Sequence, residues 1–117
     1  MSEKNPDLIA VSQQINDAMA AIEARKATAS TPADFQALNG SLAQLNQRLQ
    51  SVNGLIFAER SDTIAQAAAE VEEAEAELAD AIRSAEQVNR VIASVTGFLG
   101  LVDRVIGAAS GLPGARA

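Results

Sequence analysis

The chain has 117 residues, of which 48% are hydrophobic, and it contains no Trp, Tyr, Cys or His. Without imidazole or thiol groups it has no histidine base, cysteine nucleophile, Cys/His metal site or disulfide. Nine basic and fifteen acidic residues give a net charge of -6, which argues against nucleic-acid binding because that needs a basic stripe. We therefore expect a non-enzymatic, acidic protein with no cofactor and no catalytic metal.

The hydrophobic residues favour helices: 25 of them are alanine and only three are phenylalanine. The polar start, Met1 to Asp7, leads directly into an amphipathic pattern. It has no basic segment followed by an apolar one, so we expect a cytoplasmic protein or one exported without a Sec signal peptide. The longest uncharged apolar stretch, Val91 to Val102, would span about 18 Å as a helix. A bilayer core requires about 30 Å, so a simple transmembrane helix is not expected.

The first two helices are predicted over about residues 6–28 and 32–57. Pro6 and Pro32 fit first-turn positions, and Ser30 or Thr31 can cap the second helix. The second helix has apolar residues at alternating spacings of three and four, which is typical of a heptad seam. These residues are Phe35, Leu38, Leu42, Leu45, Leu49, Val52 and Ile56.

One very long helix is predicted over about residues 62–110. Two sets of seven heptad positions are all apolar, a pattern typical of a coiled-coil seam. The sets are Ile64, Val71, Leu78, Ala85, Ile92, Leu99, Ile106 and Ala67, Ala74, Ala81, Val88, Val95, Val102, Ala109. The predicted fold is a single all-α domain over residues 1–117, an antiparallel helical hairpin or three-helix bundle of coiled-coil type, with residues 111–117 as a frayed tail. In this arrangement the second helix packs against roughly Asp62 to Gln87.

The remainder of that long helix would overhang the bundle, and it is the most apolar part of the chain. We call its ten large apolar residues the C-terminal girdle; they are Val88, Val91, Ile92, Val95, Phe98, Leu99, Leu101, Val102, Val105 and Ile106. Exposed in a monomer they would form a large apolar patch. The girdle is therefore predicted to bind a second copy, giving a homo-oligomer, or a partner helix. Aspartate at Val95 and Leu99 is then expected to give a helical monomer.

Two alternatives remain for the girdle. A break at Gly97–Gly100 would let residues 101–110 fold back and bury the patch within the chain. The segment 88–110 would otherwise insert into a membrane surface as an amphipathic helix, although it lacks the Lys/Arg excess that anionic lipid favours.

A second unusual surface lies on the predicted second helix, where Arg48 is the only charged residue between Phe35 and Ala58. Interfaces are depleted in charge whereas solvated helix faces carry it, so this amide-rich face indicates either association or an ordinary amide-rich soluble helix. The acidic run from Glu70 to Asp80 is interpreted as a solvated face, since di-iron bundle sites need histidines. The predicted function is that of a structural or interaction protein, for example a subunit or accessory protein of a larger assembly or secretion apparatus. The alternative is a membrane-active protein.

Overall fold

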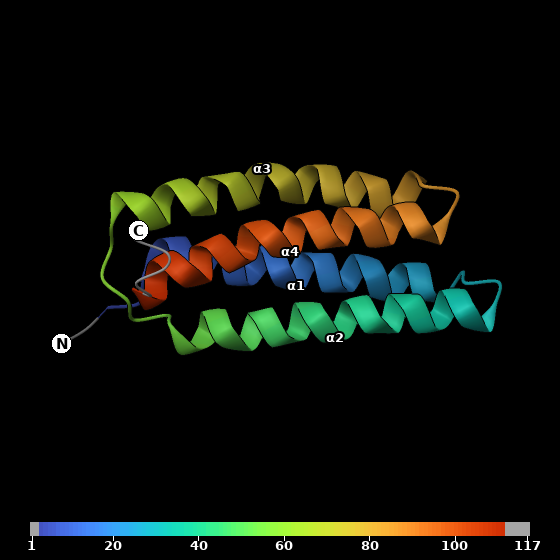
Figure 1. Cartoon of the computed structure of the whole chain (residues 1–117), viewed down its shortest axis with the longest axis horizontal. Helices are drawn as coiled ribbons and strands as arrows, with labels where there is room; N and C mark the ends of the chain where they lie inside the picture. The colour runs from blue at the N-terminus through green and yellow to red at the C-terminus, as the bar shows by residue number, and fades with distance from the viewer. Residues whose placement is uncertain (1–2, 112–117) are drawn as a thin grey trace.

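The computed structural model describes residues 3–111, which form four helices of similar length and contain no strand. The helices are α1 (Pro6–Lys26), α2 (Pro32–Gly54), α3 (Asp62–Ser84) and α4 (Val88–Ser110), and they lie side by side along the long axis of the molecule (Figure 1). The all-α prediction is confirmed. The three-helix arrangement with one very long C-terminal helix is wrong. Residues 112–117 of the predicted tail lie outside the described residues, and Gly111 ends α4 in the left-handed conformation, at φ 67°.

Three of the four helices begin at a side chain that caps them. Asn5, Thr31 and Ser61 each accept a hydrogen bond from a backbone N–H in the first turn. Pro6 and Pro32 follow two of these caps, where a missing N–H costs nothing. Short polar side chains at these positions satisfy donors that have no partner within the helix. These local hydrogen bonds explain why two of the helices begin where the sequence predicts, directly after Asn5 and Thr31.

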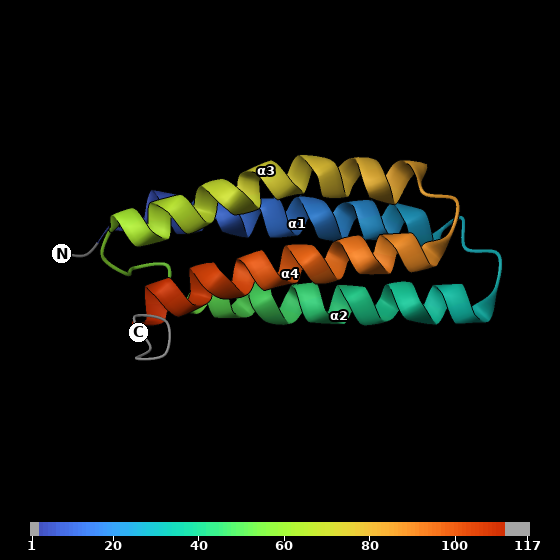
Figure 2. The ribbon, with the colours of Figure 1, turned by 45° about the horizontal axis from the view of Figure 1, so that its top comes forward.

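The predicted long helix is interrupted at Ala85–Gln87. Ala85 keeps a helical φ of -66° but has a ψ of 128°, and Gln87 has φ -105° and ψ 133°. The chain reverses there, so α4 returns along α3 (Figure 2). A reversal buries the girdle within the same chain, and this tertiary gain outweighs the local preference for a continuous helix. The alternative break at Gly97–Gly100 is not found, because both glycines lie inside α4.

The four helices form two hairpins, α1–α2 and α3–α4, that pack so that α1 is beside α3 and α2 is beside α4. These two inter-hairpin pairs are parallel. Helices α2 and α3 lie diagonally opposite each other, so the predicted packing of the second helix against Asp62–Gln87 is wrong. The connection from Leu55 to Ser61 crosses one end of the bundle (Figure 1).

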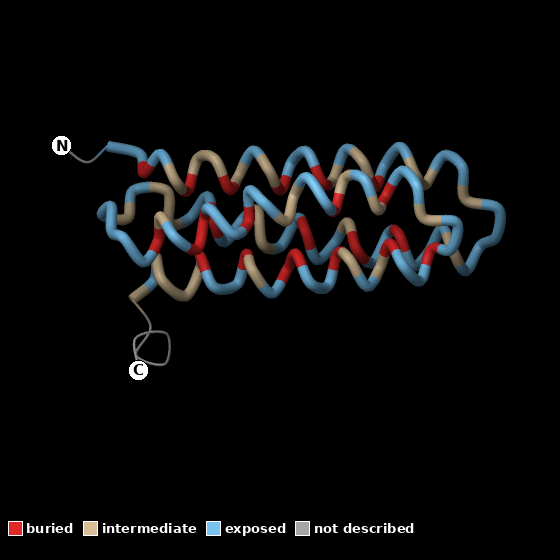
Figure 3. Tube along the Cα trace, turned by 90° about the horizontal axis from the view of Figure 1, so that it is seen from above, coloured by how far each residue is buried: buried red, intermediate tan, exposed pale blue. Residues whose placement is uncertain are grey.

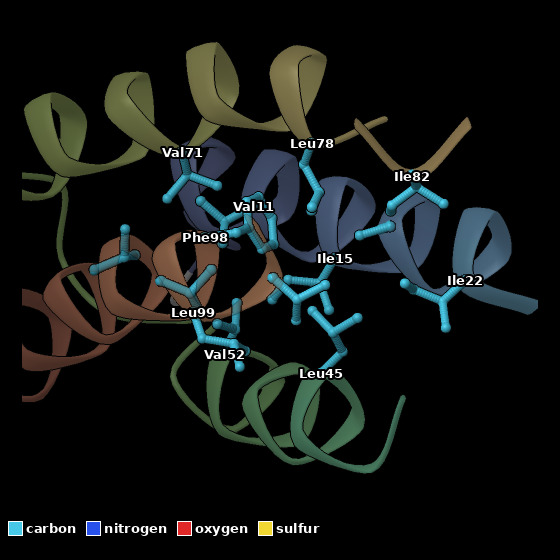
Figure 4. Packing of buried hydrophobic residues seen from close by; sticks show 14 of the residues in the cluster. Val11, Ile15, Ile22, Leu45, Val52, Val71, Leu78, Ile82, Phe98 and Leu99 are labelled. Carbon is cyan, nitrogen blue, oxygen red and sulfur yellow. The ribbon is translucent and has the colours of Figure 1, made fainter. Parts of the chain in front are cut away.

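The core runs along the centre of the bundle, where buried positions recur on the inward side of every helix (Figure 3). Side chains from all four helices meet there (Figure 4), including Ile15 of α1, Leu45 of α2, Leu78 of α3 and Phe98 of α4. Helix α3 contributes small residues such as Ala67 and Ala68, which are 8% and 7% exposed. Alternating small and large side chains fills the space between close helices.

Asn5 holds the diagonal connection against the start of α1, and it is buried, with 1% exposure. Its Oδ1 accepts hydrogen bonds from the backbone N–H groups of Asp7 and Leu8. Its Nδ2 donates to the carbonyl oxygen of Ala58 at 3.1 Å, and its backbone N–H donates to that of Ile56 at 2.6 Å. One residue thus caps α1 and fixes the crossover.

Candidate interaction surface

The girdle residues lie mostly in the core of the bundle. Seven are buried and three are half-buried, and all three half-buried residues, Ile92, Leu101 and Ile106, pack against the core. The buried members are Val88, Val91, Val95, Phe98, Leu99, Val102 and Val105. The overhang that suggested an intermolecular role for them is therefore absent from this fold. As long as α4 stays docked, these seven side chains are not available to a partner.

The amide-rich side of α2 is on the surface, as its composition suggested. None of the exposed residues of α2 is charged, since Asp34 and Arg48 are both half-buried. Helix α2 contains nine Ser, Asn and Gln residues, and Ser41 alone among them is buried. The exposed ones are Gln36, Asn39, Gln44, Asn46, Gln47, Gln50, Ser51 and Asn53.

The exposed side of the neighbouring helix α4 carries four small residues between the charged residues Arg90, Asp103 and Arg104. Ala93, Thr96, Gly97 and Gly100 are all exposed. A Cβ added at Gly97 or Gly100 would meet nothing within 4 Å, so no contact within the described chain requires a glycine there. A glycine inside a helix costs about 0.5–1 kcal/mol relative to alanine. We define the α2/α4 face as these four residues together with Gln44, Gln47 and Ser51, which are the exposed polar residues beside Arg48 on the side of α2 that faces α4.

Charge is divided between the two sides of the bundle. Helices α1 and α3 together carry ten acidic and three basic residues, a net charge of -7, whereas α2 and α4 carry two acidic and three basic residues, a net of +1. Most of the acidic run lies on the exposed side of α3. The α2/α4 face is therefore the side on which another macromolecule meets the least charge.

Two ion pairs connect α4 to its neighbours, so two of its exposed charged residues are paired with side chains of α2 and α3. Arg48 of α2 binds both carboxylate oxygens of Asp103, at 2.8 and 3.2 Å. Arg104 binds Glu70 of α3 at 3.2 Å. Both pairs are partly exposed, so their contribution to stability is small, but a bidentate arginine fixes the register of α2 against α4.

Polar side chains also surround a hollow at the end of the bundle where α3 meets α4. This hollow, about 600 Å³, lies beside the α3–α4 turn and is lined by polar side chains that include Glu77, Asp80, Glu86 and Arg90. Within residues 3–111 no group of three or more acidic side chains is arranged to hold a metal ion. The acidic residues of α3 extend outward along the helix and do not converge.

Searches against protein-family models, curated proteins and solved structures each return no match. By length and composition α4 is the one described helix that could cross a membrane, with a mean hydropathy of 1.6 in its most apolar window and 33% of that window buried. The core helix of a bundle passes the same test.

The long-range hydrogen bonds of Asn5 and Arg25 could not be predicted from the sequence. Arg25 of α1 donates to the backbone carbonyl oxygens of Ile82, at 2.7 Å, and Glu86, at 3.5 Å. Neither contact has a periodic signature, because each joins segments more than 50 residues apart. The diagonal crossover and the α3–α4 turn, which create these contacts, were not predicted.

Proposed function

We propose that this chain is a non-enzymatic structural or interaction protein that binds through the α2/α4 face, with a second copy of the chain as the partner to test first. The observation that supports this proposal is the absence of charge from every exposed residue of α2, on a protein whose net charge is -6. Two copies meeting through their acidic α1/α3 sides would repel each other, whereas the α2/α4 faces carry almost no net charge.

The size of the face also suits a stable contact. A helix of 23 residues is about 34 Å long, and two adjacent helices present a strip about 20 Å wide. The strip covers roughly 700 Å² per partner, near the 800 Å² of a standard interface. Amide side chains can hydrogen-bond across such a contact without the cost of desolvating ions.

The glycines of α4 provide a prediction that separates folding from binding. Changing both Gly97 and Gly100 to alanine is expected to raise the free energy of unfolding by about 1–2 kcal/mol, since each removes a helix glycine. If another helix approaches α4 closely, the added methyl groups obstruct it, and self-association should weaken. Urea denaturation and light scattering measure the two effects. A variant that is more stable and associates as well as the wild type would contradict close approach at these glycines.

Light scattering of the purified chain across micromolar to millimolar concentrations tests the proposal directly. We expect a concentration-dependent dimer or larger species, lost when Gln44 and Thr96 are both changed to glutamate. The matched control changes Gln13 and Ala69, which are exposed on α1 and α3, and it adds the same charge elsewhere. A monomeric wild type, or equal weakening by both variants, would contradict self-association through this face.

The second candidate is a membrane-active protein that inserts the 88–110 segment. The apolar composition of α4 favours it, whereas its packing in the core opposes it, since insertion would expose the inward sides of the other three helices. Flotation with vesicles distinguishes the two: tight vesicle binding by a chain that is monomeric in solution would favour the membrane candidate.

A further inference from the structure

The turn between α3 and α4 has none of the residues that usually make a helix end. Its three residues, Ala85, Glu86 and Gln87, are all good helix formers. Within residues 3–111, Gln87 is the only helix N-cap whose side chain makes no capping hydrogen bond. The two other connections differ, because Thr31 precedes Pro32 and Ser61 caps α3. The reversal at residues 85–87 is thus imposed by the fold and not by local sequence.

The backbone of the turn is also close to a helix. The N–H of Ala85 still donates to the carbonyl oxygen of Ala81 at 2.9 Å, as it would within a helix. The φ of Ala85 is already helical, at -66°, and only its ψ of 128° departs from helical values. Rotation at Ala85 and at the next two residues would join α3 and α4 into one helix. The apolar heptad positions continue through this segment without a phase shift.

Arg25 holds the reversed turn in place. Its guanidinium donates to the carbonyl oxygen of Ile82 at 2.7 Å. In a continuous helix that oxygen would accept from the N–H of Glu86, four residues later. The second contact of Arg25, to the carbonyl oxygen of Glu86 itself at 3.5 Å, also involves the turn. A side chain from α1 therefore competes with the hydrogen bond that would extend α3.

We propose that the chain forms a domain-swapped dimer in which residues 62–110 become one continuous helix and α4 docks into the α1–α2–α3 unit of a second copy. Each α4 then recovers its core contacts, including those of Phe98 and Val102, with the other chain. Exchange of an identical element is a low-cost route to a dimer, and a short hinge without turn residues favours it. The girdle would then bind a second copy after α4 leaves its own bundle. This inference does not depend on the α2/α4 face.

A cysteine pair tests the exchange cleanly, because the chain contains no cysteine. Glu70 and Arg104 form an ion pair between α3 and α4, so Glu70→Cys with Arg104→Cys places two thiols on adjacent helices, where a bifunctional maleimide crosslinker can join them. The protein is refolded at millimolar concentration, crosslinked, separated by size, and run on a denaturing gel. In a swapped dimer the crosslinks join two chains, so the dimer fraction should run as a covalent dimer. A dimer that falls apart into single, internally bridged chains overturns the proposal and points to face-to-face association.

Two substitutions at the turn should move the equilibrium in opposite directions. Arg25→Ala removes the charge-assisted hydrogen bond that competes with helix extension. The equilibrium constant for the swapped dimer should therefore rise about tenfold for each turn, and about a hundredfold for a dimer with two turns. Gln87→Ser supplies the missing cap and should reduce dimer formation. Arg83→Ala is the matched control, since Arg83 is exposed at the same end and pairs only with nearby Asp80 among the ion pairs of the described residues.

Light scattering and small-angle X-ray scattering read the outcome. The swapped dimer should be far longer than the 49 Å of the closed bundle. If Arg25→Ala fails to fold, the wild type and Gln87→Ser still give the comparison. The proposal would be overturned if the wild-type protein stays monomeric after refolding at millimolar concentration. It would also be overturned if Gln87→Ser leaves the dimer fraction unchanged.

Discussion

Changing both Val95 and Leu99 to aspartate is expected to unfold the chain. The two side chains are 1% and 4% exposed and lie between all four helices. An unpaired carboxylate in such a core costs several kcal/mol, and two exceed the total stability of many small domains, about 5–15 kcal/mol. Far-UV circular dichroism should show most of the helix signal lost and no cooperative thermal transition. This expectation is the reverse of the helical monomer that the sequence alone suggested, because the girdle is now a core.

The control for that variant carries the same two charges on the exposed side of the same helix. Ala93→Asp with Thr96→Asp should remain folded, with a change in the free energy of unfolding of about 1 kcal/mol or less. A folded, helical Val95/Leu99 double variant would show that α4 does not depend on its own chain for burial. It would return the girdle to an intermolecular role.

Replacing Asn5 with alanine is expected to lower the free energy of unfolding by about 2–3 kcal/mol. The cap of α1 accounts for about 1 kcal/mol, and the loss of the partner of the Ala58 carbonyl oxygen accounts for about 1–2 kcal/mol more. Urea denaturation at equilibrium measures the change. The loss is large for a single polar residue because the same side chain serves two distant segments.

Serine at position 5 separates the two roles. Its hydroxyl can cap α1 but is too short to reach the carbonyl oxygen of Ala58, so Asn5→Ser should lose only the part that belongs to the crossover. Equal losses for serine and alanine would mean that the crossover bond carries the effect. An alanine variant within about 0.5 kcal/mol of the wild type would show that the crossover is held by other contacts.

The first two helices were predictable because their ends are local. Asn5, Thr31 and Pro32 each satisfy or remove a donor at a helix start, so the sequence signals the boundary where it occurs. The predicted ends at residues 28 and 57 overran the observed ends at Lys26 and Gly54, which is usual where the last turn loosens.

The α3–α4 turn could not be predicted from local sequence. Ala85, Glu86 and Gln87 continue the heptad pattern and have high helix propensity. The only sequence signal for a reversal was the excess of apolar residues after Val88. These residues had to be buried, either within the same chain or against a partner. From the sequence alone, the alternative to a continuous helix is a break at Gly97–Gly100, because glycine is the usual helix breaker. Instead, those glycines continue α4 and face outward.

The candidate surface was half predictable. The uncharged side of α2 followed from composition, because a helix without charges stands out among helices rich in glutamate. The contribution of α4 did not, since it depends on which side of α4 faces inward. That side became known only once the turn at Ala85–Gln87 returned α4 to the bundle and buried Val91, Val95 and Phe98.

The division of charge also gives the molecule a permanent electric dipole across its width. Ten of the twelve carboxylates on the helices belong to α1 and α3. A positively charged resin or a basic protein would therefore exert a torque on the bundle within about one Debye length, near 10 Å at 0.1 M salt, and turn α1 and α3 toward itself before contact. The molecule would attach in one preferred orientation, with α2 and α4 pointing away. One side could then be anchored by charge while the opposite side stayed free for a neutral partner.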